Sequence, residues 1–571
     1  MAFIRTTKNK EGRTHVYLVE GYRVDGKVKQ RIIKKFGLLD ELERDEPNIL
    51  ERLKREAKEG KLQPETEITV MFDLDAPISK PDQSYGWLVL DDIYNELNLQ
   101  KFLQGIGKKK INETLKLLVY QRILQPNSKK ATVESQIDLF GNWKVDLNSV
   151  YRSLSEFNTW KEDLQLHIHQ RVSQLTNRQA TLVFYDVTNY YFETDIDDQE
   201  ITDDEGNVSA VGLRRRGPSK EHRPKPIVQM GLFMDQNGIP ISYKLFRGNQ
   251  TDPVTYIPAI EQVKKQFGIE KVVVVADKAM NSKDNITQTL SNQDGYLFSQ
   301  KHRGRRGAPK DIQEFILSNE GWQYNEQATF AKKSFIRSRK VGNKKDSPVI
   351  QEKVLVTWNK KYADREKIRR EGALEYAQKL TQPELFRRTS KKGGKKYLEL
   401  EYLDSETGEL KPFSPHISLK HEEIAFDEQF DGINVLVTSE TTMTDEEMIE
   451  SYGQLYKIED CFRVTKTEFS ARPVYVWTEE HIEGHFLTCF LALVLLRLLQ
   501  YRTEWAMSPE RMIKAMNSAK ATPLKDDYYR LQENTDMTEL NRLLGIDWSK
   551  GIVTYEQLKQ YAKGSYTTQK Y

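Results

Sequence analysis

Two aspartates, Asp186 and Asp277, each follow a short apolar run rich in β-branched and aromatic residues. The runs are TLVFYDVT at residues 181–188 and KVVVVAD at residues 271–277. Such runs predict strands buried on both faces of a sheet. Ligands of α/β sheets collect at the carboxyl ends of the strands, so two carboxylates delivered there can converge on one ion. A lone aspartate after a strand is more often a helix cap or turn residue; it is the pair that predicts a divalent-metal site.

The third acid of such a site cannot be chosen from composition, because the chain has 84 aspartates and glutamates. Three segments narrow the choice: FYDVTNYYFE, VVVVADKAMNS and SYGQLYKIEDCFRVTKTEFSARPVYVWTEEHIEGHF. Together they resemble the DDE transposases of bacterial insertion sequences, in the group that carries a β-strand insertion between its second and third acids. The resemblance covers roughly residues 180–500, whereas residues 1–178 fit the group only loosely.

The signature of that group is Tyr, two residues, Arg, three residues, Glu, six residues and Lys. Tyr452, Glu459 and Lys466 match the signature in register, and Leu455 stands at the arginine position. This departure removes one expected contact with phosphate or carboxylate. Arg463, one helical turn beyond Glu459, is a candidate replacement.

The resemblance implies both a reaction and a metal requirement. It implies that Asp186, Asp277 and Glu459 bind two Mg²⁺ ions, for which Mn²⁺ can substitute, on a ribonuclease H-like fold. One ion would activate water or a DNA 3′-hydroxyl, and the other would stabilise the leaving oxygen of an in-line displacement at phosphorus. The resemblance also implies that Tyr452 and Lys466 contact the DNA backbone, although a surface aromatic on a helix explains Tyr452 equally well.

The acids need a scaffold that brings two strands and a helix together. The runs IVQMGLFMD and IPISYKLF flank Asn237-Gly238, which predicts a β-hairpin, and a helix at about 253–267 leads to the strand before Asp277. This order predicts an α/β core with a mixed sheet. Thr444 and Glu447 form a capping box that predicts the start of a helix running to about residue 466.

The expected organisation has six parts. The catalytic core is split by an insertion, and two smaller modules precede it. The parts are a basic β-hairpin module (1–78), a helical domain (80–178), the first part of the core (179–299), a β-rich basic insertion (300–429), the second part of the core (430–505) and a C-terminal helical tail (506–571).

Positive charge is concentrated at the N-terminus. The first 38 residues carry ten basic and three acidic side chains, around two β-rich runs that flank Asp25-Gly26. A basic hairpin with Tyr17 and Tyr22 is suited to lie against phosphates. A solvated charged sheet face explains the same pattern, and both interpretations stay open.

Two further basic segments lie near the expected active edge. Because they fall in loops punctuated by glycine and proline, we expect DNA contacts there. Trp322 and Trp358, in the insertion, could stack on an unpaired base, but a core role is the more common one for a lone tryptophan. The arginines are Arg214, Arg215 and Arg216 in the first segment and Arg303, Arg305 and Arg306 in the second.

Composition limits the setting of the protein. The formal net charge is only +3, so the whole-chain charge identifies no partner. Two cysteines, Cys461 and Cys489, cannot make a disulfide framework or a Cys-rich zinc site, and no apolar signal segment opens the sequence. The apolar run at 486–496 is shorter than a membrane-spanning helix. We therefore expect a cytoplasmic protein that does not bind a membrane.

Other chemistries have weaker support. His481 and His485 are spaced for a metal on a helix, but no HExxH pattern surrounds them, and no GxxxxGK[ST] loop predicts nucleotide hydrolysis. A glycosidase with paired carboxylates fits poorly with the basic segments. The preferred interpretation is a transposase that pairs two element ends of double-stranded DNA as a homodimer. A ribonuclease H-like nuclease without strand joining and a non-catalytic DNA-binding derivative are the alternatives.

Overall fold

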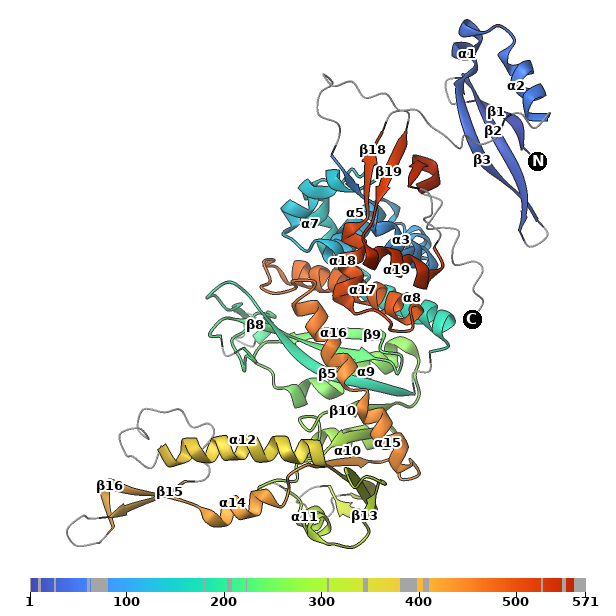
Figure 1. Cartoon of the computed structure of the whole chain (residues 1–571). Helices are drawn as coiled ribbons and strands as arrows, with labels where there is room; N and C mark the ends of the chain where they lie inside the picture. The colour runs from blue at the N-terminus through green and yellow to red at the C-terminus, as the bar shows by residue number, and fades with distance from the viewer. Residues whose placement is uncertain are drawn as a thin grey trace. The chain divides into compact units, whose positions relative to one another are not determined.

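The structure, a computed structural model, divides into two compact units, Met1–Ser79 and Lys80–Tyr571 (Figure 1). Each unit has its own hydrophobic core. The residues that the structure describes are 2–8, 12–24, 27–58, 62, 81–178, 181–202, 208–221, 223–304, 308–341, 348–379, 398–403, 410–524, 527–546 and 551–558.

The N-terminal unit is a three-stranded antiparallel sheet with two helices, and Val16, Ile49 and Leu53 form its core. The predicted hairpin is confirmed, because Val24 pairs with Lys27; its Asp25-Gly26 turn lies outside the described residues. The run ITVMFD at 68–73, whose residue types predict a strand, also lies outside them. The elements are β1 (Ala2–Lys8), β2 (Thr14–Val24), β3 (Lys27–Leu38), α1 (Leu39–Asp45) and α2 (Ile49–Lys58).

A nine-stranded mixed sheet is the centre of the second unit, with strand order β12-β13-β14-β17-β11-β10-β5-β8-β9. β10 pairs in parallel with β5 and β11, whereas β8 pairs antiparallel with β5 and β9. The β8–β9 hairpin turns at Asn237-Gly238 as predicted, with Gly238 at a φ of 81°. The bounds are β5 (Leu182–Tyr191), β8 (Ile227–Met234), β9 (Pro240–Arg247), β10 (Val273–Ala276), β11 (Gly295–Ser299) and β17 (Ile433–Thr438). The mixed α/β sheet that the sequence predicted is therefore present.

Helices cover both faces of this sheet. Tyr185 and Val187 of β5 pack in the core that contains α9 (Asp252–Phe267) and α10 (Lys283–Ser291). Phe184 and Tyr190 of β5 pack in the core that contains α16 (Tyr456–Lys466) and α17 (Glu479–Arg502). Figure 1 shows α16, in orange, against β5. α17 has the length and apolarity of a membrane-spanning helix, but its apolar window is entirely buried in the protein.

The segment before the core is helical, as predicted, but the C-terminal segment is not only helical. Its strands form a small sheet with β4 (Gln83–Ser84), from the start of the helical segment, so the two ends of this unit pair. The C-terminal elements are α18 (Pro509–Ser518), β18 (Lys520–Pro523), β19 (Tyr528–Gln532), α19 (Thr535–Leu544) and β20 (Ile552–Thr554). The helices before the core are α3 (Trp87–Glu96), α4 (Leu99–Gly105), α5 (Asn112–Leu124), α6 (Lys129–Glu134), α7 (Leu147–Thr159) and α8 (Lys161–Thr176), with 3₁₀ turns at Lys109–Ile111 and Ser135–Asp138.

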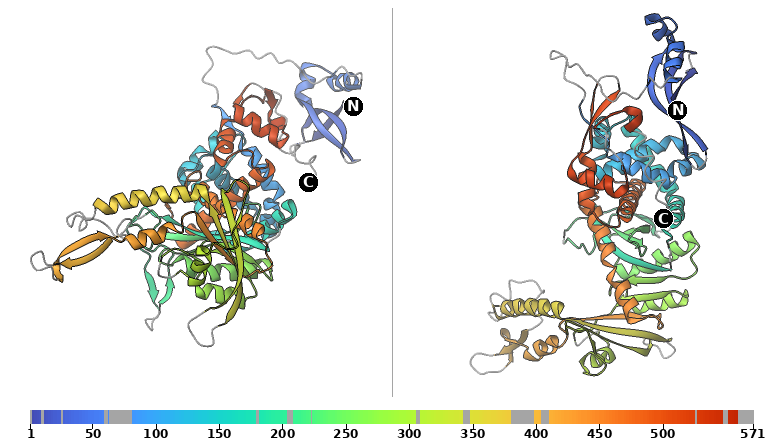
Figure 2. Two further views of the ribbon diagram at one scale, coloured as in Figure 1. Left: turned by 60° about the horizontal axis from the view of Figure 1, so that its bottom comes forward. Right: turned by 45° about the vertical axis from the view of Figure 1, so that its right-hand side comes forward.

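The insertion is not the separate β-rich module that the sequence suggested. Its strands β13 and β14 extend the central sheet through β17, and it contains the long helix α12 (Figure 2). α12 has no continuous apolar stripe, but it is rich in alanine, glutamate, lysine and arginine, which favour helix by propensity. The elements are α11 (Lys310–Leu317), β12 (Gln323–Tyr324), β13 (Phe330–Lys340), β14 (Val349–Asn359), α12 (Lys360–Lys379), β15 (Leu398–Leu403), β16 (Leu410–Leu419) and α14 (His421–Glu428). A two-stranded sheet of β6 (Glu200–Thr202) and β7 (Val208–Val211) lies between β5 and β8 in the sequence.

The helix predicted from residue 444 to 466 is two helices. The capping box at Thr444 is confirmed, with Glu447 accepting from the Thr444 backbone N–H at 2.8 Å. It starts α15 (Asp445–Gly453), and α16 begins three residues later, after a turn at Gln454 and Leu455. The signature residues Tyr452 and Glu459 therefore stand on different helices.

Candidate active site

The sheet register places the two aspartates side by side. Val275 of β10 pairs in parallel with Phe184 of β5, and continuing this register by two residues brings Asp277 opposite Asp186. Neighbouring strands lie about 4.8 Å apart, and residues in register in a parallel pair point to the same face. Asp186 is the fifth residue of β5 and not at the carboxyl end that the sequence predicted, because the strand continues to Tyr191. The register nevertheless places it beside Asp277.

The same face of β5 carries the contact with α16. Asp186 and Tyr190 are four residues apart on one strand, so their side chains point the same way. The hydroxyl groups of Tyr190 and Thr465 lie 2.7 Å apart, which fixes α16 on this face. Glu459 lies less than two helical turns before Thr465, on the helix that covers the Asp186 side of the sheet.

All three predicted acids affect the pKa of the Tyr452 hydroxyl. Burial raises the pKa of its hydroxyl; a hydrogen bond with Ser299 opposes the rise, and the negative charges of Asp277, Glu459 and Asp186 add to it. The negative charges of all three acids thus act on this one tyrosine. Tyr452 is therefore half-buried beside the acids rather than a free surface aromatic.

The neighbouring acid on α16 is engaged elsewhere. Asp460 accepts from Arg497 at 2.8 Å and from Arg463 at 2.9 Å. Burial raises its pKa, but the two guanidinium groups outweigh burial and leave the pKa below its usual range. Glu459 is exposed and has no hydrogen bond or ion pair with any residue that the structure describes. Of the two neighbours, Glu459 is the carboxylate available for binding.

The Asp186 carboxyl is electrostatically unusual. Burial raises its pKa to about 6. Lys220 and the backbone N–H of Val187 oppose this rise, while Asp277 and Asp252 add to it. Three acids therefore lie near one another at this end of the sheet, and Lys220 only partly balances their negative charge. A bound cation would lower the raised pKa of Asp186 by adding positive charge.

The donor set fits a hard divalent cation. Asp186 accepts from the N–H of Val187 at 2.7 Å and Asp277 from the N–H of Ala279 at 2.5 Å, and neither forms an ion pair within the described part of the chain. Carboxylate oxygens are the ligands that Mg²⁺ and Mn²⁺ take. Among the described residues, however, no three acid, histidine or cysteine side chains lie close enough to form a finished metal site.

A cavity of about 380 Å³ opens beside the acids. It is lined by Asn189 of β5, Lys220, Asp252 and Ala279, the last only two residues after Asp277. The Lys220 ammonium donates to the carbonyl of Val187 at 2.6 Å, which holds its charge near Asp186. Asp252 also feels Asp277, since burial raises its pKa and Asp277 adds to the rise.

Sequence reasoning missed Asp252 as a member of this site. Thr251, Asp252 and Pro253 have the residue types of a helix start, because an acid and a proline are both favoured in the first turn. That structural explanation gave no reason to connect residue 252 with an acid pair on other strands.

Lys466 is held by a carboxylate that the sequence did not single out. Glu221 pairs with Lys466 at 3.4 Å and with Arg472, and accepts from the Asn189 amide at 2.7 Å. Burial raises the pKa of Glu221, but these donors outweigh burial and lower it overall. The signature lysine thus lies near β5, and its charge is partly balanced before any DNA is bound.

The predicted DNA-binding arginines mostly have acidic partners. Arg303 pairs with Glu366 and Asp431, and Arg463 pairs with Asp460 and Glu468. Arg305 and Arg306 lie outside the described residues. In the other loop the pairs are Arg214 with Asp198, Arg215 with Glu200 and Arg216 with Asp197. DNA contacts by these arginines stay predictions, and any such contact must compete with a carboxylate.

The remaining candidates are structural. Leu455, at the arginine position of the signature, is buried, so a guanidinium there would need a different local packing. His485 is buried and its pKa is far below the usual value because of burial, while His481 stacks loosely on Tyr151. Trp322 and Trp358 both pack against the core of the insertion side of the sheet.

Solved structures offer only distant likenesses. A piggyBac transposase synaptic complex with hairpin DNA shares 9% identity and a TM-score of 0.35, covering 72% of this chain and 70% of that one. A pre-cleavage Mos1 transpososome shares 10% identity and a TM-score of 0.14, covering 45% of this chain and 70% of that one. These values are too low to compare individual residues. No curated protein matches the chain.

Family comparison is more decisive. Residues 4–67 match the family described as IS1634 family transposase, N-terminal domain. Residues 208–495, half of the chain, match the family described as Transposase DDE domain; this range includes Asp277 and Glu459 and begins after Asp186. The chain therefore belongs to the DDE transposases and is an enzyme of the polynucleotidyl transferase type.

Proposed function

We propose that this protein binds the ends of an insertion sequence, cleaves the DNA there and joins the 3′ ends to target DNA with the help of Mg²⁺. The observation that carries the proposal is the pairing of β5 and β10, which puts Asp186 opposite Asp277 on the face covered by α16. The five strands β5, β8, β9, β10 and β11 would then be a ribonuclease H-like core that the insertion interrupts.

In this proposal Asp186, Asp277 and Glu459 hold two Mg²⁺ ions. Bound there, the ions would supply activation of the attacking oxygen and stabilisation of the leaving oxygen at phosphorus. The protein's own contribution is to hold carboxylates on rigid elements, two on neighbouring strands and one on a packed helix. Tyr452 and Lys466 would contact DNA on either side of the acids, and phosphate would replace Glu221 as the partner of Lys466.

End recognition is assigned to the N-terminal unit. Its strands β2 and β3 form a hairpin in the segment of high positive charge, which suits contact with phosphates. Because two ends must be paired before joining, the proposal includes a homodimer on DNA and a cytoplasmic location. These points rest on the sequence and on the transposase family.

The decisive experiment uses the inverted repeats that flank the coding region of this protein. Purified protein is incubated with a duplex that carries one repeat, a supercoiled target and Mg²⁺, and the products are resolved on a denaturing gel. We expect cleavage at the repeat end and covalent joining of its 3′ strand to the target. Omission of metal should abolish both products.

The same experiment separates the alternatives. Cleavage without any joined product would indicate a nuclease, and binding without either product would indicate a non-catalytic derivative. A duplex with a scrambled repeat is the control for end recognition. Equal cleavage of repeat and scrambled duplex would contradict the assignment of the inverted repeats as substrate.

A further inference from the structure

A second polar cavity lies at the end of the sheet where Asp277 follows β10. Its volume is about 490 Å³, and it forms where β14 and β17 meet the start of α12. Thr357 and Asn434, which pair across the two strands, line one side of it. Lys361 and Arg365, one helical turn apart on α12, line the other. Among the described residues, none that lines this cavity is acidic.

Charges on α12 fall into two groups. On one side the helix is tied to the protein: Glu366 accepts from the N–H of Gly432 at 2.8 Å, and Arg370 pairs with Asp431. Lys361 and Arg365 are exposed, and neither makes a hydrogen bond or ion pair with any residue in the described ranges. Their positive charges are thus not needed to hold α12 in place.

The lining chemistry selects a multi-oxygen anion. Besides the two cations, the lining has three neutral groups that can donate hydrogen bonds: the Thr357 hydroxyl, the Tyr362 hydroxyl and the Asn434 amide. Guanidinium and ammonium groups together bind phosphate oxygens well, and no carboxylate of the described lining competes with them. A phosphate group satisfies this set, whereas an apolar ligand would leave it without partners.

The strand register gives the distance from this cavity to the acids. Ala276 pairs with Phe298, Phe298 with Val437, and Val437 with Val354, so these four residues form one row across the sheet. Measured from this row, Asn434 and Thr357 lie two residues further out than Asp277, and two and three strands away from it. With strand spacing of about 4.8 Å and a rise of about 3.3 Å per residue, the separation is roughly 12 to 16 Å.

We propose that this cavity binds one backbone phosphate of the DNA that is cut at the acids. The inference rests on the proposed function and names a contact that the family signature does not include. A separation of roughly 12 to 16 Å is short enough to be spanned by a few nucleotides of one DNA strand. The insertion would thereby fix the position of the scissile phosphate, because a second phosphate is held at a set distance on the same rigid sheet.

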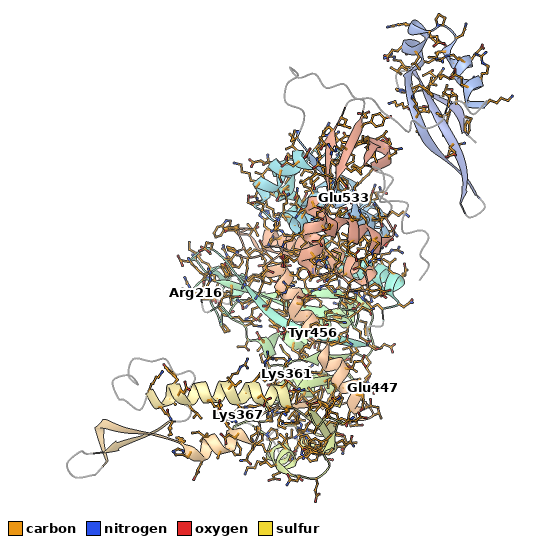
Figure 3. The ribbon with its side chains drawn as sticks, in the orientation of Figure 1. Arg216, Lys361, Lys367, Glu447, Tyr456 and Glu533 are labelled. Carbon is orange, nitrogen blue, oxygen red and sulfur yellow. The ribbon has the colours of Figure 1, made fainter. Side chains whose placement is uncertain are left out.

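The test compares two double variants of one helix. K361Q/R365Q removes the cavity cations, and K367Q/R369Q removes two exposed cations of α12 that do not line the cavity. Figure 3 shows Lys361 at the end of α12 that joins the sheet and Lys367 further along the helix. We expect the first variant to bind a 30-base-pair end duplex about tenfold more weakly. The slope of log affinity against log salt concentration should become shallower by about one. The control variant should match the wild type within about twofold.

A neutral phosphate substitute identifies the contact. Single methylphosphonates are placed at each position within six nucleotides of the cut, and binding is measured for the wild type and both variants. The wild type and the control should lose affinity at one position a few nucleotides from the cut, and K361Q/R365Q should show no loss there. If all three proteins show the same pattern, the proposal is overturned.

A free anion is the competing occupant. Inorganic phosphate binding is measured by calorimetry at constant ionic strength. Phosphate binding that K361Q/R365Q abolishes, together with an unchanged methylphosphonate pattern, would assign the cavity to a free anion and overturn the DNA assignment. Melting temperatures are compared for all proteins, and if the double variant is unstable the single variants K361Q and R365Q give the same comparison.

The outcome is separable from that of the proposed function. A wild-type protein that binds the duplex, shows the methylphosphonate effect and yet does not cleave would contradict the proposed function and support the cavity contact. A wild-type protein that cleaves and joins, but whose affinity and salt slope do not change in K361Q/R365Q, would overturn the cavity contact alone. Absence of all DNA binding would overturn both.

Discussion

The active edge of the sheet and the arginine loop before β8 carry charge in opposite ways. At this end of the sheet Asp186 and Asp277 form no ion pair in the described structure, although the Lys220 charge lies near Asp186. Lys361, at the second cavity, likewise forms no ion pair with a described residue. In the loop, Arg214 pairs with Asp198 at 2.5 Å, and Arg216 also donates to backbone carbonyls of its own loop. Figure 3 shows Arg216 at this loop. Unpaired charge is available to substrate, whereas paired charge first has to be released.

This difference changes which residues are expected to matter. A dense run of arginines in a sequence suggests DNA binding, yet the folded chain uses most of those charges internally. An ion pair lowers the net charge that DNA encounters. On this view, whether a charged residue has an ion-pair partner decides if it binds substrate, and the local density of charge does not.

The largest effect is expected from the unpaired acids. Asp186→Asn, Asp277→Asn and Glu459→Gln should each reduce cleavage and joining by about 10³-fold or more, because each removes a carboxylate from the metal-binding set. Double variants should be scarcely worse than single ones, since the acids act as a unit. Rates are measured under single-turnover conditions with the end duplex.

End binding should persist in these variants or strengthen slightly, because a negative charge facing phosphate is lost. Near-normal cleavage by Glu459→Gln would show that the third acid is misassigned. Normal cleavage by all three single variants would contradict the proposed mechanism.

The next effect separates two adjacent acids on α16. Asp460→Asn should lower the free energy of unfolding by about 3 kcal/mol, because Arg497, which is only 2% exposed, loses its charged partner. Glu459→Gln should change stability by less than about 0.5 kcal/mol. Denaturant unfolding measures both variants, and cleavage is expressed per folded molecule.

Cleavage by the Asp460→Asn variant should stay within a few fold of the wild type. A large loss of activity with unchanged stability in that variant would place Asp460, rather than Glu459, in the candidate site.

A smaller effect follows from the raised pKa of Asp186. The folded-state pKa is about 6, above the ordinary value of 3.8 for an aspartate, so the folded protein holds this proton more tightly than the unfolded chain. Stability contributed by the protonated form is complete below the unfolded pKa and is lost as pH rises through about 6. Without metal, Asp186→Asn should therefore be more stable than the wild type at pH 8, by at most about 3 kcal/mol, with less advantage at pH 4.

Thermal unfolding in a chelator across pH 4 to 8 measures this difference. Addition of Mg²⁺ at pH 8 should raise the melting temperature of the wild type and leave that of Asp186→Asn nearly unchanged. An equal rise in both proteins would mean that the metal stabilises the fold elsewhere.

The smallest effect is expected from the paired arginines. Simultaneous replacement of Arg214, Arg215 and Arg216 by glutamine should weaken end binding by no more than about threefold, although three charges are removed. The α12 double variant, which loses two charges, should be affected more. Fluorescence anisotropy over a range of salt concentrations compares the two.

A larger loss and a steeper change in salt slope for the arginine triple variant would show that these ion pairs open on DNA. The local density of basic residues in the sequence would then predict DNA contacts better than the absence of an acidic partner does.

Much of the local structure follows from the sequence itself. The apolar runs before Asp186 and Asp277 form buried strands, Asn237-Gly238 makes a hairpin turn, and the Thr444 capping box starts a helix. Each of these depends on interactions within a few residues: burial pattern, positive φ or a side-chain cap. The predicted signature around Glu459 is local in the same way, because its spacing lies within one short segment.

Other features were decided by contacts distant in sequence. α12 was missed because its helix has no apolar stripe, and the insertion joined the central sheet because β14 pairs with β17, about 80 residues later. Strand pairing over such separations depends on which edges are left open in the folded chain, which local patterns do not encode.

Tertiary structure alone decides which charged residues have an ion-pair partner. The sequence shows Glu459 and Asp460 as equivalent neighbours, but only Asp460 meets Arg497 from α17. It likewise shows basic residues at 214–216 and in α12 without saying which of them meet an acid. Ion pairing requires side chains within about 4 Å, so it is settled only when distant elements pack. The sequence by itself determined which residues can carry the chemistry, and the packing decided which of them are left free to do it.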